Sequence, residues 1–83
     1  MKTLYKFEAE WCGPCHAIRP AVAQIVKEYN LDLQVINIDE DAEAANVFEV
    51  RTIPALLLYE DGVPIGRHIG SAPASVIIKN LGL

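Results

Sequence analysis

The sequence predicts an α/β fold in which helices flank a four-stranded mixed sheet, in the minimal order βαβαββα. Two observations support this prediction. Short runs rich in β-forming residues alternate with longer runs whose apolar residues recur every three and four positions. The last two strand-like runs are separated by Asp61-Gly62, a strong turn signal. We therefore expect a parallel βαβ unit followed by an antiparallel hairpin.

Length and charge limit the possible classes of protein. The chain has 83 residues, 52% of them hydrophobic, so we expect one domain over residues 1–83. The net charge of -4 and the lack of a Lys/Arg cluster argue against binding to nucleic acid. No apolar run is long enough to span a bilayer, and no export signal is visible, so we expect a cytoplasmic monomer that binds no membrane.

The first strand is predicted over residues 2–8, which are rich in β-forming side chains. A helix follows that begins near Cys12 or Gly13 and ends near Tyr29. Pro20 lies inside it and has no N–H to donate, so we expect a kink one turn after the cysteines; the alternative is a helix that begins only at about Pro20. The predicted buried stripe of this helix is Ile18, Ala21, Val22, Ile25, Val26 and Tyr29.

Residues 33–39 form a nearly continuous apolar run, which predicts a strand buried on both faces in the sheet interior. A short helix is predicted next, capped by Asp39 or Asp41 and ending near Glu49. It is the weakest of the helical patterns.

Residues 55–59 and 63–69 predict the two strands of the hairpin. Pro64 cannot donate to a strand ladder, so the second of these strands is expected at an edge of the sheet. A last helix is predicted to open at residues 71–73. The side chains expected to pack it on the sheet are Val76, Ile77 and Leu81.

The predicted chemistry centres on Cys12 and Cys15, the only two cysteines, which lie where the first strand gives way to helix. Two thiols at this spacing can close into a small disulfide ring and open again. Cys12 falls at the helix N-terminus, where free backbone N–H groups and the helix dipole favour a thiolate, and its sulfur is expected to be exposed to solvent. Cys15, about one turn further on, is the natural resolving thiol. The pattern indicates redox chemistry at the C-terminal end of a strand, where open α/β sheets place their active sites.

Three other uses of the cysteines have weaker support. His16 completes a Cys-x-x-Cys-His haem-attachment pattern, but Met1 is the only methionine and His68 the only other histidine. A closed zinc site needs four ligands, and the chain offers two thiols and two separated imidazoles. A purely structural disulfide with so short a loop would constrain the unfolded chain little. We expect no metal and no bound cofactor apart from the redox-active Cys12–Cys15 disulfide.

The chain resembles the thioredoxin family over nearly its whole length. The most specific match is Trp-Cys-Gly-Pro-Cys at residues 11–15, followed much later by Ile-Pro at 53–54 before a strand. The resemblance implies a thioredoxin-like fold, a nucleophilic Cys12, a resolving Cys15 and a cis Pro54 facing them. Further matches are Pro20, Asn37-Ile38-Asp39, Asp61-Gly62 and Gly70. The implied apolar surface for a disulfide-containing partner comprises Trp11, Gly13, Pro14, Ile53, Pro54, Gly70 and Ser71.

The chain departs from the family pattern at several points. The family's usual first strand and helix are not recognisable, as in the small thioredoxin- and glutaredoxin-like proteins, so one sheet face is expected to be less covered. Lys6 replaces a common buried aspartate, and Val35 replaces its usual lysine partner. A charged Lys6 beneath the cysteines would favour thiolate and make the pair more oxidising. The charges of Glu8 and Glu10 oppose this, and the long lysine stem can carry its amine out to water. His16 is either a proton relay or a solvated helix position.

These features predict a thiol-disulfide oxidoreductase of thioredoxin type that reduces protein disulfides. By resemblance, an NADPH-dependent thioredoxin reductase supplies the electrons. One alternative is a glutaredoxin-like protein recharged by glutathione, which the chain length favours and Gly13-Pro14 opposes. The other is a binding subunit with the same fold, in which redox activity is incidental.

Overall fold

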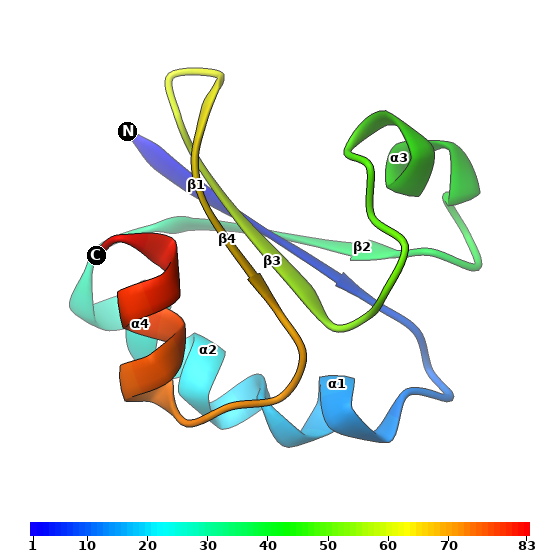
Figure 1. Cartoon of the computed structure of the whole chain (residues 1–83), viewed down its shortest axis with the longest axis horizontal. Helices are drawn as coiled ribbons and strands as arrows, with labels where there is room; N and C mark the ends of the chain where they lie inside the picture. The colour runs from blue at the N-terminus through cyan, green and yellow to red at the C-terminus, as the bar shows by residue number, and fades with distance from the viewer.

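The computed structural model describes all 83 residues and confirms the predicted α/β fold (Figure 1). Its strands lie in the order β2-β1-β3-β4 across one sheet. β1 is parallel to β2, and β3 is antiparallel to both β1 and β4. The elements are β1 (Lys2–Glu8), α1 (Gly13–Ala17), α2 (Arg19–Glu28), β2 (Asp32–Asn37), α3 (Ala42–Val47), β3 (Ala55–Glu60), β4 (Val63–Ile69) and α4 (Ala74–Leu81).

Each face of the sheet carries its own buried cluster. Because successive strand residues point to opposite faces, Leu4 of β1 packs on the α2 and α4 side whereas Phe7 packs on the α3 side. Figure 1 shows α1, α2 and α4 along one side of the strands and α3 on the other. The larger cluster comprises Leu4, Ile18, Val22, Ile25, Leu31, Leu56, Leu58, Ile77 and Leu81. The smaller one comprises Phe7, Val50, Ala55 and Leu57.

The helix after the cysteines is interrupted, rather than kinked as expected. α1 ends at Ala17, and α2 begins at Arg19, so the break falls at Ile18 and places Pro20 in the first turn of α2. Proline is tolerated there because first-turn N–H groups have no intrahelical acceptor. The expectation of one helix is therefore wrong, although the predicted start near Gly13 and the predicted end near Tyr29 agree with α1 and α2.

The prediction of a doubly buried second strand is also wrong. β2 pairs only with β1, which makes it an edge strand. Its residues are exposed or half-buried, and Val35 is 53% exposed. The apolar run that predicted an interior strand reflects side chains that only partly reach the two clusters.

The remaining elements agree with prediction within a few residues. Asp41, not Asp39, caps α3, because its Oδ1 accepts a hydrogen bond of 3.0 Å from the Ala44 N–H. β3 and β4 form the expected hairpin around Asp61-Gly62, both with positive φ, and β4 lies at the sheet edge. α4 begins at Ala74, directly after Pro73.

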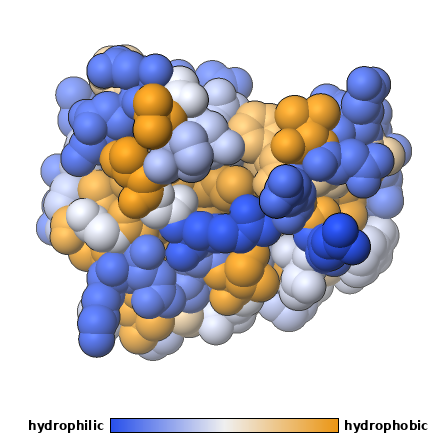
Figure 2. All heavy atoms as spheres, turned by 45° about the horizontal axis from the view of Figure 1, so that its top comes forward, coloured by the Kyte–Doolittle hydropathy of each residue, from blue (hydrophilic) through white to orange (hydrophobic).

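Apolar side chains also reach the surface, in patches between hydrophilic ones (Figure 2). The most exposed of them are Met1, Trp11, Val35, Val47 and Val63. None of the helices is long and apolar enough to cross a membrane.

Candidate active site

Cys12 and Cys15 form a disulfide at the start of α1. Cys12 is the N-cap residue of this helix, and its Sγ accepts a hydrogen bond from the Cys15 N–H at 3.2 Å. The Cys12 N–H donates in turn to the Ala9 carbonyl at 3.1 Å, which fixes the turn between β1 and the helix. The Cys12 sulfur thus occupies the position where a helix terminus stabilises negative charge.

Both cysteines are buried in the disulfide form, with 4% of Cys12 and 1% of Cys15 exposed. They form a small cluster with Ala9, against which Ile38 and Ile53 pack. The expected solvent exposure of Cys12 is therefore wrong for this form, because the disulfide and its apolar neighbours cover the residue. The immediate surroundings of the sulfurs are apolar.

The strand register brings three separate segments to the same end of the sheet. Phe7 of β1 pairs with Ala55 of β3, which pairs with Ile69 of β4. The cysteine loop, residues 53–54 and residues 70–71 each adjoin one of these positions. The sheet therefore gathers the sequence-predicted partner surface around the disulfide.

The residues of this surface differ in burial. The Ile53–Pro54 bond is cis, as the resemblance implies, and Pro54 is fully buried. The Gly70 N–H donates to the Pro54 carbonyl at 2.8 Å, which joins the two segments. Ile53 and Gly70 are half-buried, and Gly13, Pro14 and Ser71 are exposed.

Trp11 lies at the surface beside the cysteines, with 68% of the residue exposed. Its Nε1–H donates to Asp39 Oδ2 at 2.9 Å, and the Asp39 N–H donates to Asn37 Oδ1 at the same distance. The loop after β2 therefore anchors the indole. The sequence identified Trp11, whereas Asp39 was noted only as a family match and as a candidate helix cap, with no link to the indole.

Lys6 lies behind the cysteines, as its position in the strand predicted. Its Nζ donates to the Cys15 carbonyl at 3.2 Å and lies 2.7 Å from Glu8 Oε1. The Lys6 side chain is only 3% exposed. Of the two possibilities for Lys6, the amine therefore stays inside the protein and is not carried out to water, because an internal carbonyl and an internal carboxylate hold it.

Glu8 and Arg19 complete this charged cluster. Arg19 Nη2 donates to Glu8 Oε2 at 3.2 Å, while the Glu8 side chain is only 12% exposed. Burial by itself raises the pKa of the Glu8 carboxyl, but the hydrogen bond and charge of Lys6, together with Arg19, outweigh it and lower the pKa below its ordinary value. A pocket of about 320 Å³ is lined by Lys6, Glu8, Arg19, Val22, Ala23, Leu33 and Val35.

His16 is half-buried on α1. Its Nε2 lies 2.9 Å from the Glu10 carbonyl oxygen, which can only accept, so Nε2 carries the proton of this hydrogen bond. This contact ties α1 to the loop that precedes Cys12. Only Nδ1 remains free for proton exchange.

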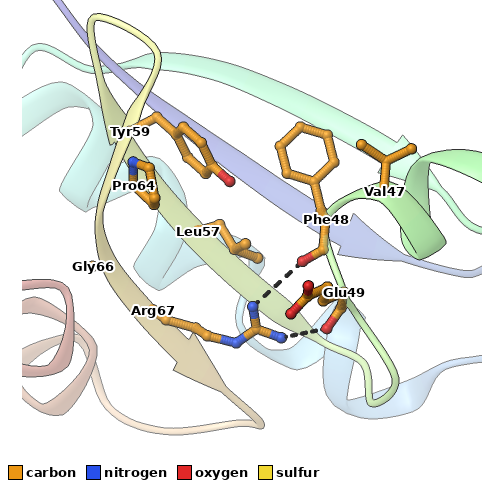
Figure 3. A pocket seen from close by; sticks show the side chains of 8 residues that line it. All are labelled: Val47, Phe48, Glu49, Leu57, Tyr59, Pro64, Gly66 and Arg67. Atoms are coloured by element: carbon orange, nitrogen blue, oxygen red, sulfur yellow. Dashed lines mark hydrogen bonds between the residues drawn. The ribbon is translucent and has the colours of Figure 1, made fainter.

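The larger pocket of the molecule lies away from the disulfide, on the α3 side of the sheet (Figure 3). It has a volume of about 430 Å³, and none of the sequence-predicted site residues lines it. Arg67 closes one side by donating to the carbonyls of Phe48 and Glu49, the latter at 2.8 Å. No cluster of three or more His, Cys, Asp or Glu residues that could hold a metal ion occurs here or elsewhere.

Comparison with known proteins agrees with this geometry. The thioredoxin family model matches residues 1–82. Thioredoxin from Mycobacterium tuberculosis is 38% identical over 80 residues, which cover 94% of this chain and 69% of that protein. Thioredoxin from Staphylococcus haemolyticus is 36% identical and matches 94% of this chain and 81% of its own length. The structure of oxidised mitochondrial thioredoxin 3 from Saccharomyces cerevisiae superposes with a TM-score of 0.80 and 31% identity, covering 99% of this chain and 78% of that one. With a cysteine pair closed at the N-terminus of α1, the chain belongs to the thioredoxin family and is a thiol-disulfide oxidoreductase of thioredoxin type.

Proposed function

We propose that the protein reduces disulfides in other proteins, with Cys12 as nucleophile and Cys15 as resolving thiol. The observation that carries these roles is the N-cap position of Cys12, whose Sγ accepts the Cys15 N–H. The same hydrogen bond stabilises a thiolate at Cys12 in the reduced protein. The Cys15 sulfur has no such donor.

The reaction proceeds by two thiol-disulfide exchanges. The Cys12 thiolate attacks one sulfur of the partner disulfide, a mixed disulfide forms, and the other partner sulfur leaves as a thiolate. The Cys15 thiol gives up its proton and attacks Cys12 Sγ, which closes the Cys12–Cys15 disulfide and releases the second partner thiolate. Two electrons pass to the partner, and its two thiolates take up two protons from the solution.

The partner is held on the apolar surface around the disulfide. Trp11, Gly13 and Pro14 form its cysteine-loop side, and they are exposed. Ile53, Gly70 and Ser71 form the opposite side, and the buried Pro54 supports them from beneath. Shallow apolar surfaces of this kind accept extended segments of varied sequence.

Electron supply completes the cycle. The proposed donor is an NADPH-dependent thioredoxin reductase, and the proposed location is the cytoplasm, where a reducing environment returns the pair to the dithiol form. The proposed working form is a monomer. Lys6 is proposed to tune the redox potential, because its amine binds the Cys15 carbonyl, and His16 is proposed to exchange protons through its free Nδ1.

A glutaredoxin-like cycle recharged by glutathione is the alternative enzyme. Insulin reduction followed in two parallel assays separates the two, one with NADPH and thioredoxin reductase and the other with NADPH, glutathione and glutathione reductase. We expect turnover in the first assay. Turnover only with glutathione would reject the proposed electron donor.

A binding subunit with incidental redox activity predicts a different result. In that case Cys12→Ser would retain the biological function, whereas the proposed cycle requires that this variant reduces no protein disulfide. The conservative Cys15→Ser variant is the matched control, because it still attacks a partner and stops at the mixed disulfide.

A further inference from the structure

His68 has no role in the proposed redox cycle, yet it is 95% buried at the end of β4, with 5% exposed. Its Nε2 lies 3.0 Å from the Gly70 carbonyl oxygen, and its Nδ1 lies 2.8 Å from Asn80 Nδ2 of α4. The Gly70 carbonyl oxygen can only accept, so Nε2 donates to it, and the amide nitrogen of Asn80 donates to Nδ1. Both ring nitrogens are thus used in hydrogen bonds within the protein.

These bonds act on the segment that follows β4. Gly70 has a φ of +94°, a conformation that glycine adopts at little cost. Its N–H donates to the Pro54 carbonyl at 2.8 Å, and its carbonyl accepts from His68. Gly70 is therefore held on both sides, by the Pro54 segment that adjoins the disulfide and by the imidazole.

The position of Asn80 depends on the close approach of α4 to β4. A Cβ on Gly66 would overlap the Leu81 carbonyl, so only glycine at this position lets the end of α4 approach the strand. Ile77 and Leu81 are buried in the main cluster and hold the helix there. Gly70 is the first residue after β4, in the segment that Figure 1 shows bending round from β4 to α4.

The backbone of the next two residues remains available. The N–H and C=O groups of Ser71 and Ala72 make no hydrogen bond within the protein, and Ser71 is exposed. An extended peptide segment carries complementary N–H and C=O groups at regular intervals. Holding Gly70 in place fixes the direction in which these free groups are presented.

We propose that His68 and Asn80 are positioning residues for partner recognition, which fix the Gly70–Ala72 segment so that it binds the extended backbone beside a partner's disulfide. This inference rests on the proposed reduction of protein disulfides. It assigns no chemical step to either residue. We call the two hydrogen bonds of His68, to Gly70 and to Asn80, the clamp. Loss of the clamp therefore weakens partner binding and leaves the sulfur chemistry intact.

The test compares reduction of insulin with reduction of a small aromatic disulfide, 5,5′-dithiobis(2-nitrobenzoate), which lacks a peptide segment. We expect Asn80→Ala to raise the KM for insulin about threefold to tenfold, the change expected for the loss of one hydrogen bond, with kcat unchanged. Its rate with the small disulfide should equal that of the wild type. Lys79→Ala, at an exposed neighbouring position of α4, is the matched control and should change neither.

His68 provides the second variant pair. His68→Leu removes both hydrogen bonds, whereas His68→Gln places an amide N–H near the position of Nε2 and should recover much of the insulin KM. Nitrogen chemical shifts of His68 in the wild-type protein should report a proton on Nε2, the nitrogen that lies against the Gly70 carbonyl oxygen. If His68→Leu does not fold, the comparison of Asn80→Ala with Lys79→Ala still decides the question.

The outcomes separate the two proposals. A wild-type protein that reduces the small disulfide but no protein disulfide rejects the proposed function and this inference with it. A wild-type protein that reduces insulin, with Asn80→Ala folded and unchanged in KM, rejects only the clamp. An equal loss on both substrates would also reject it, because that result indicates damage to the redox pair.

Discussion

The two cysteines differ in the backbone groups around their sulfur atoms. Cys12 Sγ caps α1 and accepts a hydrogen bond, whereas Cys15 lies within the helix and its carbonyl binds Lys6. The apolar cluster of Ala9, Ile38 and Ile53 surrounds both. The asymmetry between the thiols therefore arises from the helix terminus and not from a difference in burial.

This asymmetry predicts the order of reactivity in the reduced protein. The pKa of Cys12 should lie below that of Cys15, because one N–H and the helix dipole stabilise its thiolate. Brief treatment of the reduced protein with iodoacetamide near neutral pH, followed by peptide mapping, should show label mainly on Cys12. Label mainly on Cys15 would mean that the two roles are reversed.

The charges behind Cys15 predict redox shifts of opposite sign. Lys6→Met removes a cation next to Cys15, so the reduced form should lose stability and the potential should fall. Glu8→Gln removes the anion that offsets Lys6, so the potential should rise. Each shift should be at most about 30 mV, which for two electrons corresponds to about 1.4 kcal/mol. Redox titration against glutathione measures both, and shifts of the same sign would contradict this electrostatic account.

The lowered pKa of Glu8 predicts a pH-dependent contribution to folding. A carboxyl with a depressed folded-state pKa stabilises the protein fully above its unfolded value of about 4.5 and loses that contribution as the pH falls through the folded value. Glu8→Gln should therefore be less stable than the wild type near neutral pH. Urea denaturation at a series of pH values should show this deficit narrowing in acid. Glu10→Gln, at an exposed position, is the control and should show no such trend.

Among the secondary-structure elements, α3 depends most on a single cap. It has six residues and no buried side chain of its own, so the Asp41 bond to the Ala44 N–H is a large part of what holds its first turn. α1 and α2, in contrast, carry buried residues on the main cluster. Helices this short have little stability from their own backbone bonds.

Asp41→Ala should therefore destabilise the protein by about 1 kcal/mol, a typical value for loss of an N-cap. Asp41→Asn and Asp41→Ser should retain most of the stability, because both side chains still accept from the backbone. Urea denaturation measures the three variants. A variant Asp41→Ala as stable as the wild type would show that the aromatic contacts of Phe48 with Tyr5 and Phe7 hold this segment instead.

In the molecule as a whole, α4 completes the larger of the two buried clusters. It packs on β4 and α2 and completes the cluster that contains Leu4 and Ile25. It also brings Asn80 within hydrogen-bonding distance of His68. The C-terminal helix therefore stabilises the core and the segment beside the disulfide together.

Gly66→Ala should disturb both the core and the segment beside the disulfide. The added Cβ would overlap the Leu81 carbonyl, and overpacking of this kind costs about 1–3 kcal/mol. Gly13→Ala is the matched stability control, because a Cβ there meets no atom within 4 Å. Thermal denaturation should show a lower Tm for Gly66→Ala alone. Equal Tm values would mean that α4 shifts away from the strand without cost.

The sequence by itself determined the order of the elements, the hairpin, the edge position of β4 and the identity of the redox pair, because turn residues, proline and cysteine spacing act locally. It also placed Lys6 behind the cysteines through the alternation of side chains along β1. Which side chains from different elements contact one another was decided only by the tertiary structure. β2 is an edge strand because it pairs only with β1. The Trp11 indole donates to Asp39 on the loop after β2. The Lys6 amine stays inside the protein because Glu8 and the Cys15 carbonyl bind it there. The hydrogen bond between His68 and Asn80 forms only because α4 packs against β4. No local pattern in the sequence encodes the distance between two packed elements.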